Sequence, residues 1–241
     1  MPTAPPAAAS RHPHLAAPKP DGWVRVDLHS HTMWSGDATT TPDELAEAVA
    51  ESGIDVLCIT DHGTINGAVE LARSGALGCR VVVGEEVRTA AGELIGLFLT
   101  ERLPFGLKPQ DAVAAIRGQG GLVYVPHPFD PMRHCLAEDA LEALAGSGGL
   151  DAVEAFNAKV SLDHLNRRAA EFATSHGLAA GAGSDAHVAA AVGAAYVEMP
   201  DFDDASPASF LRSLRAGRVV GHHYDAPRPW RPRVVPSTKA L

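Results

Sequence analysis

The stretch VDLHSHTMWSGD, residues 26–37, ends an apolar run with two histidines one residue apart, and an aspartate follows six residues after the second. In an extended strand, side chains two positions apart point to the same side, so His29 and His31 can ligate one ion together. Alone, this pair is weak support for a metal site, because a single histidine at a strand end is more often a hydrogen-bonded or surface residue. The stretch therefore has to be interpreted together with the ends of the other strands.

Short apolar runs alternate with helical patterns along the chain, which predicts a parallel sheet with intervening helices. Most of the apolar runs are too continuous to leave one face in water, as is typical of buried parallel strands. Seven or eight strands in 241 residues favour a barrel over an open sheet, although the sequence does not give the strand order. The expected strands are residues 24–29, 56–60, 80–87, 93–100, 122–127, 151–157, 178–185 and 194–199.

Four segments carry helical signals. In the first, residues 41–53, Thr41 is the expected N-cap, Glu44 closes a capping box and Gly53 ends the helix. The other expected helices are residues 108–121, 161–177 and 205–217.

Composition limits the classes of partner. The formal net charge of −9 argues against a broad electrostatic grip on nucleic acid, so we expect a small ligand and no long nucleic acid. No apolar run approaches the roughly 20 residues of a membrane span. Three scattered cysteines without a CxxC motif indicate neither a disulfide framework nor a thiolate metal site, so we expect a soluble, cytoplasmic protein.

The chain is expected to contain one folded domain, residues 23–221. Residues 1–22 are rich in Pro and Ala and are predicted to be a flexible leader, and residues 222–241 are predicted to be a Pro/Arg-rich tail. The oligomeric state is not readable from these patterns.

Ionisable and amide side chains mark the ends of the expected strands. They are His29 and His31, Asp61 and His62, Glu85 and Glu86, His127, Asn157, and Asp185 and His187. In a parallel barrel these ends lie on one face, where the active sites of such folds are built. Bound metal ions usually offset the like-charge repulsion and desolvation cost of such a cluster. Imidazole and carboxylate ligands suit zinc, manganese or iron better than calcium or copper(I).

Taken together, these motifs resemble the polymerase and histidinol phosphatase (PHP) superfamily of metal-dependent phosphoesterases. The matching stretches are VDLHSHT with SGD and TTPDELAEAV, then CITDHGTINGAVE, VVVGEEV, LVYVPHPFD, VEAFN and AGSDAH, in family order. The resemblance implies an α/β fold, a distorted (β/α)7 TIM-like barrel, that holds two or three divalent metal ions (Mn²⁺, Zn²⁺ or Fe²⁺) in its mouth.

The resemblance also implies the ligands of each ion. One ion is implied at His29, His31 and Asp185; a second, bridged to the first by Glu86, at His127; and a third at Asp37, His62 and His187. Glu86 is preferred to Glu85 because the family pattern is Gly-x-Glu and Gly84 fixes the register.

One departure from the family pattern concerns the second ion. Many members place a further histidine before the HP motif, and this chain has none between His62 and His127. Glu93 is the nearest residue able to replace it as an oxygen ligand. The alternative is that Glu93 is a solvated carboxylate in a turn.

Divalent ions a few Å apart activate water and stabilise a departing alkoxide, which phosphate ester hydrolysis requires. Water is then the expected nucleophile, in agreement with the absence of a G-x-S-x-G or P-loop motif. His187 or Asp61 is expected to donate a proton to the leaving group, and the sequence does not choose between them. Asp61 has a second possible role, to orient an imidazole.

Four residues near strand ends are predicted to bind substrate. Arg133 and Lys159 are expected to contact phosphate oxygens, Asn157 to orient substrate or water, and Trp34 to stack on a base or sugar. Plainer alternatives stay open: surface cations for the first two and ordinary packing for Trp34. The histidines outside the motifs are expected at the surface or in the tail: His134, His164, His176, His222 and His223.

These observations predict an enzyme, a phosphomonoesterase acting on a small phosphorylated metabolite such as a nucleotide or sugar phosphate. The alternatives are a phosphodiesterase or exonuclease on short oligonucleotides, metal-dependent amide or lactone hydrolysis, and a non-catalytic metal-binding module. The nearly complete ligand set argues against the last, and the acidic charge argues against long polymers.

Overall fold

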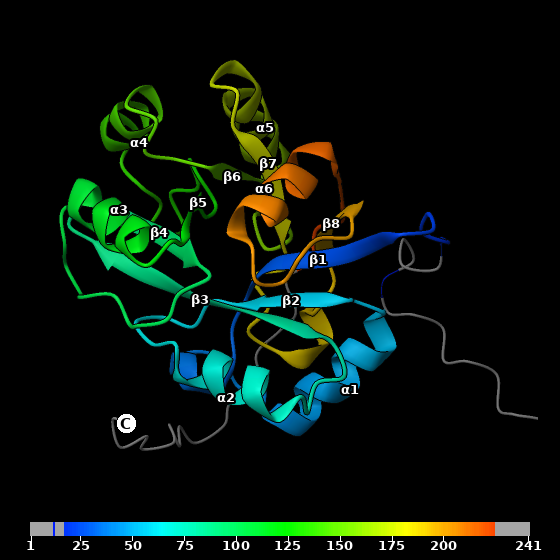
Figure 1. Cartoon of the computed structure of the whole chain (residues 1–241). Coiled ribbons are helices and arrows are strands. Elements are labelled where there is room, and N and C mark those ends of the chain that lie inside the picture. Colours follow the sequence, from blue (N-terminus) through cyan, green and yellow to red (C-terminus); the bar gives the residue numbers. More distant parts are fainter. Residues whose placement is uncertain (1–11, 13–16, 225–241) are drawn as a thin grey trace, which may run out of the picture.

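The computed structural model describes residue 12 and residues 17–224. Its strands form one sheet that curls into a nearly closed barrel, in the order β7-β6-β5-β4-β3-β2-β1-β8-β9 (Figure 1). The predicted barrel is therefore confirmed. The strands are β1 (Trp23–Ser30), β2 (Val56–Ile59), β3 (Arg80–Thr89), β4 (Gly92–Leu97), β5 (Leu122–Val125), β6 (Ala152–Asn157), β7 (Ala179–Gly183), β8 (Ala195–Pro200) and β9 (Arg218–Gly221).

The helices are α1 (Pro42–Ser52), α2 (Asn66–Ser74), α3 (Pro109–Gly118), α4 (Glu138–Gly146), α5 (Asp163–Ser175) and α6 (Pro207–Ala216), with short 3-10 turns η2 (Met33–Ser35) and η3 (Ala189–Ala191). The predicted capping box of α1 is present, since Thr41 and Glu44 each accept a hydrogen bond from the other's backbone N–H. The sequence did not predict α2, α4 or β9. Over the described part of the chain, no helix combines the length and apolar character that crossing a membrane demands.

The prediction of a parallel sheet is right for two blocks of strands and wrong for the rest. β1, β2 and β3 are parallel, as are β5, β6 and β7, but β4 is antiparallel to both its neighbours. Only Ala90 and Ala91 separate β3 from β4. So short a connection can form only a hairpin, because a parallel crossover needs a dozen or more residues. β4 consequently begins, rather than ends, at the mouth of the barrel.

The barrel closes at its mouth through the residues that follow β7. The backbone N–H of Asp185 donates to the carbonyl of His29 at 2.8 Å, and that of His31 donates to the carbonyl of Ala186 at 2.9 Å. The antiparallel pair β8 and β9 continues the sheet from the first half of β1. The HSH and SDAH motifs therefore lie side by side.

One hydrophobic cluster draws side chains from β1 to β8 and fills the interior of the barrel. Phe210 and Leu214 of α6 extend it away from the mouth. Outside the sheet, α1 and α2 cover β2 and β3 on one side, while α3, α4 and α5 cover β4 to β6 (Figure 1). Packing thus fills the barrel and its outer layer, and leaves the mouth to polar side chains.

Two bulges change which side chains face inward. In β1, Asp27 pairs with Leu57 and Ser30 with Ile59, so β1 has one residue more than β2 over this interval. β6 has one residue more than β7 between Glu154 and Phe156. Bulges re-aim side chains and are common beside active sites. The β1 bulge lets Leu28 stay in the interior cluster while His29, the next residue, reaches the mouth.

The predicted leader and tail are described only in part. Residues 1–11, 13–16 and 225–241, which include most of both, lie outside the described residues. Lys19 forms an ion pair with Asp55, and the imidazole of the buried His12 lies 3.4 Å from that of His222. The described parts of the two predicted segments therefore contact the domain and each other, and the boundaries at 22 and 222 stay predictions.

Candidate metal centre

All nine predicted ligands lie at the mouth of the barrel. Their donor atoms form four overlapping groups, and within each group the atoms lie within 4.8 Å of one another. The groups are His31, Asp37, His62 and His187; His29, His127 and Asp185; His29, His31 and Glu86; and His62, Glu86 and Glu93. Side chains from six strand ends or the loops after them thus converge on one centre.

The HSH motif forms the middle of the centre. The Nε2 atoms of His29 and His31 are 3.0 Å apart, which confirms that the two imidazoles point to the same side. Oε2 of Glu86 lies 3.3 and 3.2 Å from these nitrogens, and Oδ1 of Asp185 lies 3.8 and 3.5 Å from them. Four donors therefore surround the position expected for the first ion.

Glu86 also faces a second group. Its Oε1 lies 3.0 Å from Nε2 of His127, while Oε2 faces the HSH pair, as a bridging carboxylate requires. Oε2 of Glu93 lies 3.9 Å from the same imidazole. Glu93 is only 5% exposed, so it is not a solvated turn carboxylate. Burial and the nearby charge of Glu86 raise the pKa of Glu93 to about 7.

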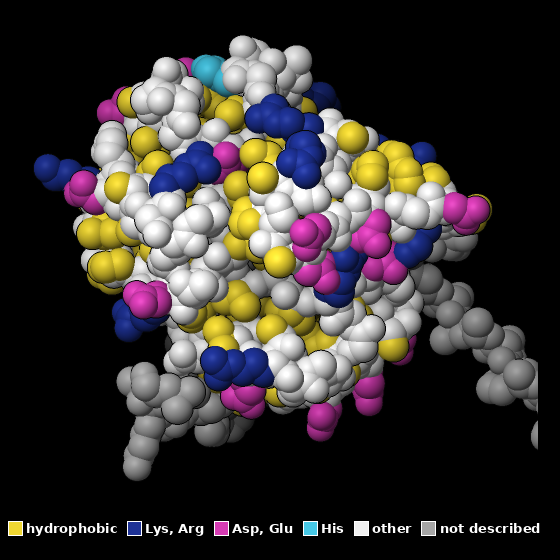
Figure 2. Space-filling model, viewed as in Figure 1, with side chains coloured by type: hydrophobic (Ala, Val, Ile, Leu, Met, Phe, Trp, Pro, Cys, Tyr) yellow, Lys and Arg dark blue, Asp and Glu magenta, His cyan; other side chains and the backbone are white. Residues whose placement is uncertain are grey.

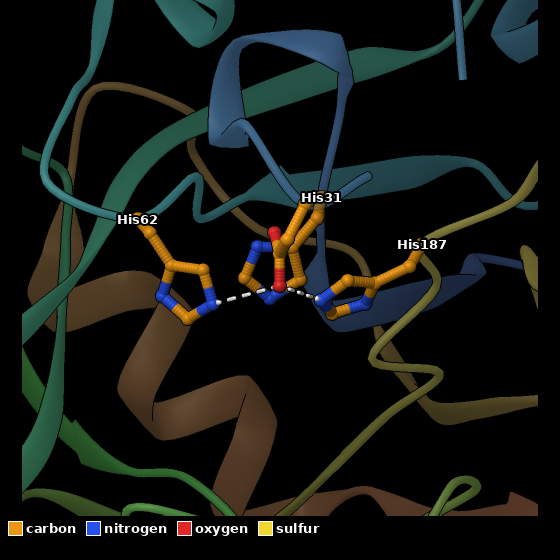
Figure 3. Close-up of side chains that lie close together, drawn as sticks. His31, His62 and His187 are labelled. Atoms are coloured by element: carbon orange, nitrogen blue, oxygen red, sulfur yellow. Dashed lines mark hydrogen bonds and ion pairs between the residues drawn. The ribbon is translucent and has the colours of Figure 1, made fainter. Parts of the chain in front are cut away.

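The third group is built around Asp37. Its Oδ2 lies 3.0 Å from Nε2 of His187 and 3.7 Å from Nε2 of His62. Figure 3 shows the imidazoles of His31, His62 and His187 converging from three segments of the chain. Burial opposes ionisation of Asp37, but the hydrogen bond and charge of His187 hold its pKa below the usual range.

The donor set fits divalent metal ions. Burial disfavours ionisation of Asp185 and Glu86, but the charges of Lys159 and His29 around the former, and of His29 and His127 around the latter, hold both pKa values well below normal. Burial and the neighbouring His187 lower the pKa of His31. Burial also acts to lower the pKa values of His29, His127 and His187, but the adjacent carboxylates raise them, so these three imidazoles would exchange a proton for a bound ion. Neutral imidazoles and ionised carboxylates are the forms in which these side chains bind metal.

Glu154, in the middle of β6, is the main residue that the sequence analysis missed. Its Oε1 lies 3.1 Å from Nδ1 of His29, and its Oε2 accepts from the backbone N–H of His127 at 2.6 Å and from Nδ2 of Asn157 at 2.9 Å. A carboxylate accepts the Nδ1 proton of His29, which leaves Nε2 free to bind metal. A glutamate inside the apolar run VEAF was the available signal.

Two of the predicted substrate-binding residues flank Asp185. Nζ of Lys159 is buried, 3.5 Å from Oδ1 of Asp185 and 3.0 Å from Nδ1 of His187. Nε of Arg133 lies 3.6 Å from Oδ2 of Asp185. Lys159 is therefore not an ordinary surface cation, and both residues concentrate positive charge at one side of the centre.

The other predicted site residues lie behind the centre rather than in it. Both oxygens of Asp61 accept hydrogen bonds from Thr32, from its N–H and its hydroxyl, at 2.6 Å each. Burial raises the pKa of Asp61 to about 6. Among its described contacts none is to an imidazole, so the geometry favours a role for Asp61 in fixing the loop after the HSH motif over proton donation.

The structure also places Trp34 and Asn157 in the interior of the protein. Trp34 is buried in the cluster formed by α1, α2 and β2, because the absence of a side chain at Gly67 lets its ring pack there. This position favours ordinary packing, and stacking of Trp34 on substrate stays a prediction. Asn157 is fully buried, and its amide donates to Glu154 and, at 3.4 Å, to Asp185. It therefore orients carboxylates of the site.

Comparisons with known proteins agree with the resemblance of the sequence motifs to the PHP superfamily. A family model described as PHP-associated matches residues 163–219. Two uncharacterized proteins of Methanocaldococcus jannaschii are 38% identical over 146 residues (56% of this chain, 82% of the relative) and 35% identical over 199 residues (80% and 79%).

Two matches to other curated proteins are shorter. A probable phosphatase of Acetivibrio thermocellus is 39% identical over 70 residues, 25% of this chain and 29% of that protein. An error-prone DNA polymerase of Mycobacterium tuberculosis is 40% identical over 68 residues, 27% of this chain and 6% of the polymerase.

A solved structure has the same fold. It is a two-domain protein of Bacteroides vulgatus described as containing a predicted PHP-like metal-dependent phosphoesterase, with a TM-score of 0.65 at 20% identity. The match covers 85% of this chain and 67% of that one.

Proposed function

Because the chain belongs to the polymerase and histidinol phosphatase (PHP) superfamily, we propose that it is a metal-dependent phosphoesterase, and specifically a phosphomonoesterase of small phosphorylated metabolites such as nucleotides or sugar phosphates. The observation that carries the proposal is the set of nine buried or half-buried donors in overlapping groups that share Glu86 and the HSH pair.

We propose different roles in hydrolysis for the metal ligands, the cationic side chains and the proton donor. When bound, divalent ions supply Lewis-acid activation of water and of the phosphoryl oxygens. Lys159 and Arg133, beside Asp185, add positive charge on the side of the centre from which we propose that the phosphoryl group enters. Of the two predicted proton donors, His187 lies in the centre and Asp61 is held by Thr32, so His187 is the better placed.

Size and charge support a small substrate. A cleft of about 390 Å³ opens beside Asp37, His62 and Glu86, within the usual volume of small-molecule sites. The chain carries a net charge of −9, and Figure 2 shows Lys and Arg side chains interspersed with Asp and Glu on the face drawn. Strand-tracking nucleic-acid sites use a continuous positive groove instead.

A phosphodiesterase of short oligonucleotides is the second candidate, and the match to an error-prone DNA polymerase favours it. That match covers little more than a quarter of this chain. The two candidates differ in whether the scissile phosphate carries one ester bond or two.

An activity panel with metal analysis tests the proposal. Protein purified after growth in metal-supplemented medium should contain more than one equivalent of transition metal, and should hydrolyse monoesters such as phenyl phosphate faster than bis(phenyl) phosphate or short oligonucleotides. Asp185→Asn should remove the activity without unfolding the protein. A preference for diesters would select the second candidate. Metal-loaded protein that hydrolyses neither ester class would overturn both, and an amide and lactone panel would then be the next assay.

A further inference from the structure

The cleft beside the metal centre is lined by two kinds of residue. Four of the proposed ligands line this cleft, and Arg88, Phe105 and His134 line it with them. None of these three residues belongs to the proposed hydrolytic machinery. Their positions follow from the β3–β4 hairpin and the two loops bound to it.

Arg88 is placed by the register of the hairpin. It follows Glu86 by two residues on β3, so the two side chains lie on the same face of the strand. It is also the direct cross-strand partner of Glu93. Arg88 is exposed, and within residues 17–224 its guanidinium forms no ion pair and no hydrogen bond. A positive charge is therefore held next to the centre, where it acts on Glu93 and is exposed to an anion in the cleft.

Phe105 lies on a loop that is tied to the same strand. The N–H of Gly106 donates to the carbonyl of Arg88 at 3.0 Å, and the N–H of Ala90 donates to the carbonyl of Leu107 at 2.8 Å. The N–H of Leu103 donates to Oε2 of Glu85 at 2.8 Å. Despite these ties, Phe105 is 70% exposed. An exposed aromatic ring on an anchored loop is a surface on which a flat group can stack.

His134 joins Arg88 and Phe105 from a third segment of the chain. Its carbonyl accepts the N–H of Glu93 at 2.8 Å, which attaches the loop after β5 to the start of β4. The imidazole is exposed and lines the cleft. Arg88 and His134 thus present a cation and a hydrogen-bond donor beside the aromatic ring.

Resting on the phosphoesterase function proposed above, we propose that Arg88, Phe105 and His134 form the leaving-group subsite, and that it selects esters whose leaving group carries a flat ring and a second anionic group. The ring stacks on Phe105, and the anion binds Arg88 and His134. Hydrolysis joins the oxygen of water to phosphorus and breaks the bond between phosphorus and the leaving oxygen, which receives the proton that water loses. Arg133 and Lys159 lie beside Asp185, and in this proposal they bind the phosphoryl group rather than the leaving group.

Binding of non-hydrolysable phosphonates tests the subsite separately from catalysis. Methylphosphonate, phenylphosphonate and 3-carboxyphenylphosphonate add first a ring and then an anion to one phosphoryl group. Titration calorimetry with the metal-loaded protein should show about ten-fold tighter binding of the carboxylated ligand than of phenylphosphonate, since a charge-assisted pair contributes about that factor. Phenylphosphonate should bind tighter than methylphosphonate.

Matched variants assign each preference to its residue. Arg88→Gln should remove most of the preference for the carboxylate and leave the affinity for phenylphosphonate unchanged. Phe105→Ala should remove the preference for the ring. Arg73→Gln, at an exposed arginine of α2, is the control and should change neither ratio. The metal content of each variant is measured alongside.

The outcomes separate the subsite from the function on which it rests. The subsite is overturned when the wild-type protein shows no preference among the phosphonates or binds none of them. It is also overturned when Arg88→Gln weakens the binding of all three ligands equally, because Arg88 would then contact the phosphoryl group that they share. Loss of metal from that variant would overturn it as well, because the role of Arg88 would then be to hold Glu93. Correct preferences without hydrolysis of any phosphoester would instead overturn the phosphoesterase proposal, and the cleft would stand as a binding site for a ring and an anion but not as a leaving-group subsite.

Discussion

At the scale of single residues, Glu154 connects three parts of the centre although it is not one of the proposed ligands. It accepts from the imidazole of His29, the backbone of His127 and the amide of Asn157, which come from three strands or the loops after them. His127 has a φ of 28°, in the region that non-glycine residues rarely adopt, so the hydrogen bond to its N–H helps to hold a strained backbone.

Glu154→Gln should therefore weaken metal binding while the protein stays folded. The amide can donate to His29 Nδ1 instead of accepting from it, which favours the wrong tautomer for binding through Nε2. Metal affinity should fall about 10- to 100-fold, as measured by competition with a chelator. Glu198→Gln is the matched control, because Glu198 is an equally buried glutamate of β8 that pairs with Arg25 and Arg218. An equal loss of metal in both variants would contradict the role given to Glu154.

Glu85 provides a prediction about pH. It faces away from Glu86, is fully buried, and its Oε1 has no hydrogen-bond partner among the described residues. Burial raises its pKa to about 7 from an ordinary value of 4.5. The folded state then binds the proton more tightly than the unfolded state, so this group lowers stability as pH rises from about 4.5 to about 7.

Glu85→Gln should remove that slope. The stability of the variant relative to the wild type should increase between pH 4.5 and pH 7 by about 3 kcal/mol, since each unit of pKa shift corresponds to about 1.4 kcal/mol. Urea unfolding at a series of pH values measures the difference. A difference that is constant across this range would show that Glu85 is not the titrating group.

At the scale of elements, the site depends on close contacts between strands at the bulges. Gly183 of β7 lies opposite Asn157, and a Cβ atom there would come within 2.3 Å of Cβ of His29 and 2.6 Å of Oε1 of Glu154. The backbone at this point has to approach the HSH strand, and only glycine leaves the space for it.

Gly183→Ala should destabilise the protein by about 2 kcal/mol or more, because overpacking forces neighbouring groups apart, and should also reduce metal content. Gly118→Ala, at the end of α3 with no atom within 4 Å of the added Cβ, is the matched change; it should be neutral or stabilising by up to about 1 kcal/mol. Thermal unfolding compares the two. Equal stabilities would mean that β7 can move away from β1 at no cost.

At the scale of the whole molecule, the mouth joins the first strand to the last strand of the barrel proper, so metal binding there should stabilise the entire domain. Removal of metal with a chelator should lower the melting temperature, and return of Mn²⁺ or Zn²⁺ should restore it. At a free metal concentration 100 times the dissociation constant, the expected stabilisation is about 2.7 kcal/mol. A melting temperature independent of metal would contradict the assignment of the mouth as a metal centre.

The sequence predicted those parts of the site that depend on local spacing. HSH, GEE and SDAH lie next to strand ends, and the alternation of a strand alone places His29 beside His31. The position of Glu93 could be stated only by resemblance, because it is in the mouth only if β4 runs antiparallel. Glu154 was missed because it belongs to no strand-end motif. The bulge in β6, which the sequence does not reveal, brings Glu154 and Asn157 together.

Trp34 shows a second limit of the sequence. Its direction is decided by the space at Gly67, a residue more than 30 positions away that belongs to a helix the sequence analysis did not find. Helix α2 has no side-chain N-cap, which explains why capping signals gave no sign of it. Long-range packing and uncapped helices are therefore what the sequence patterns could not predict.

The short turn at Ala90 and Ala91 joins two loops into one rim. Ala90 donates to Leu107 in the loop that carries Phe105, and the carbonyl of Ala91 accepts from Ala137 at 2.7 Å, beyond the loop that carries His134. These loops are distant in sequence, yet each is held in place by the same two alanines. Transfer of the selectivity of this cleft to another barrel would require both loops and the turn to be grafted together, because either loop moved alone would lose its anchoring hydrogen bonds.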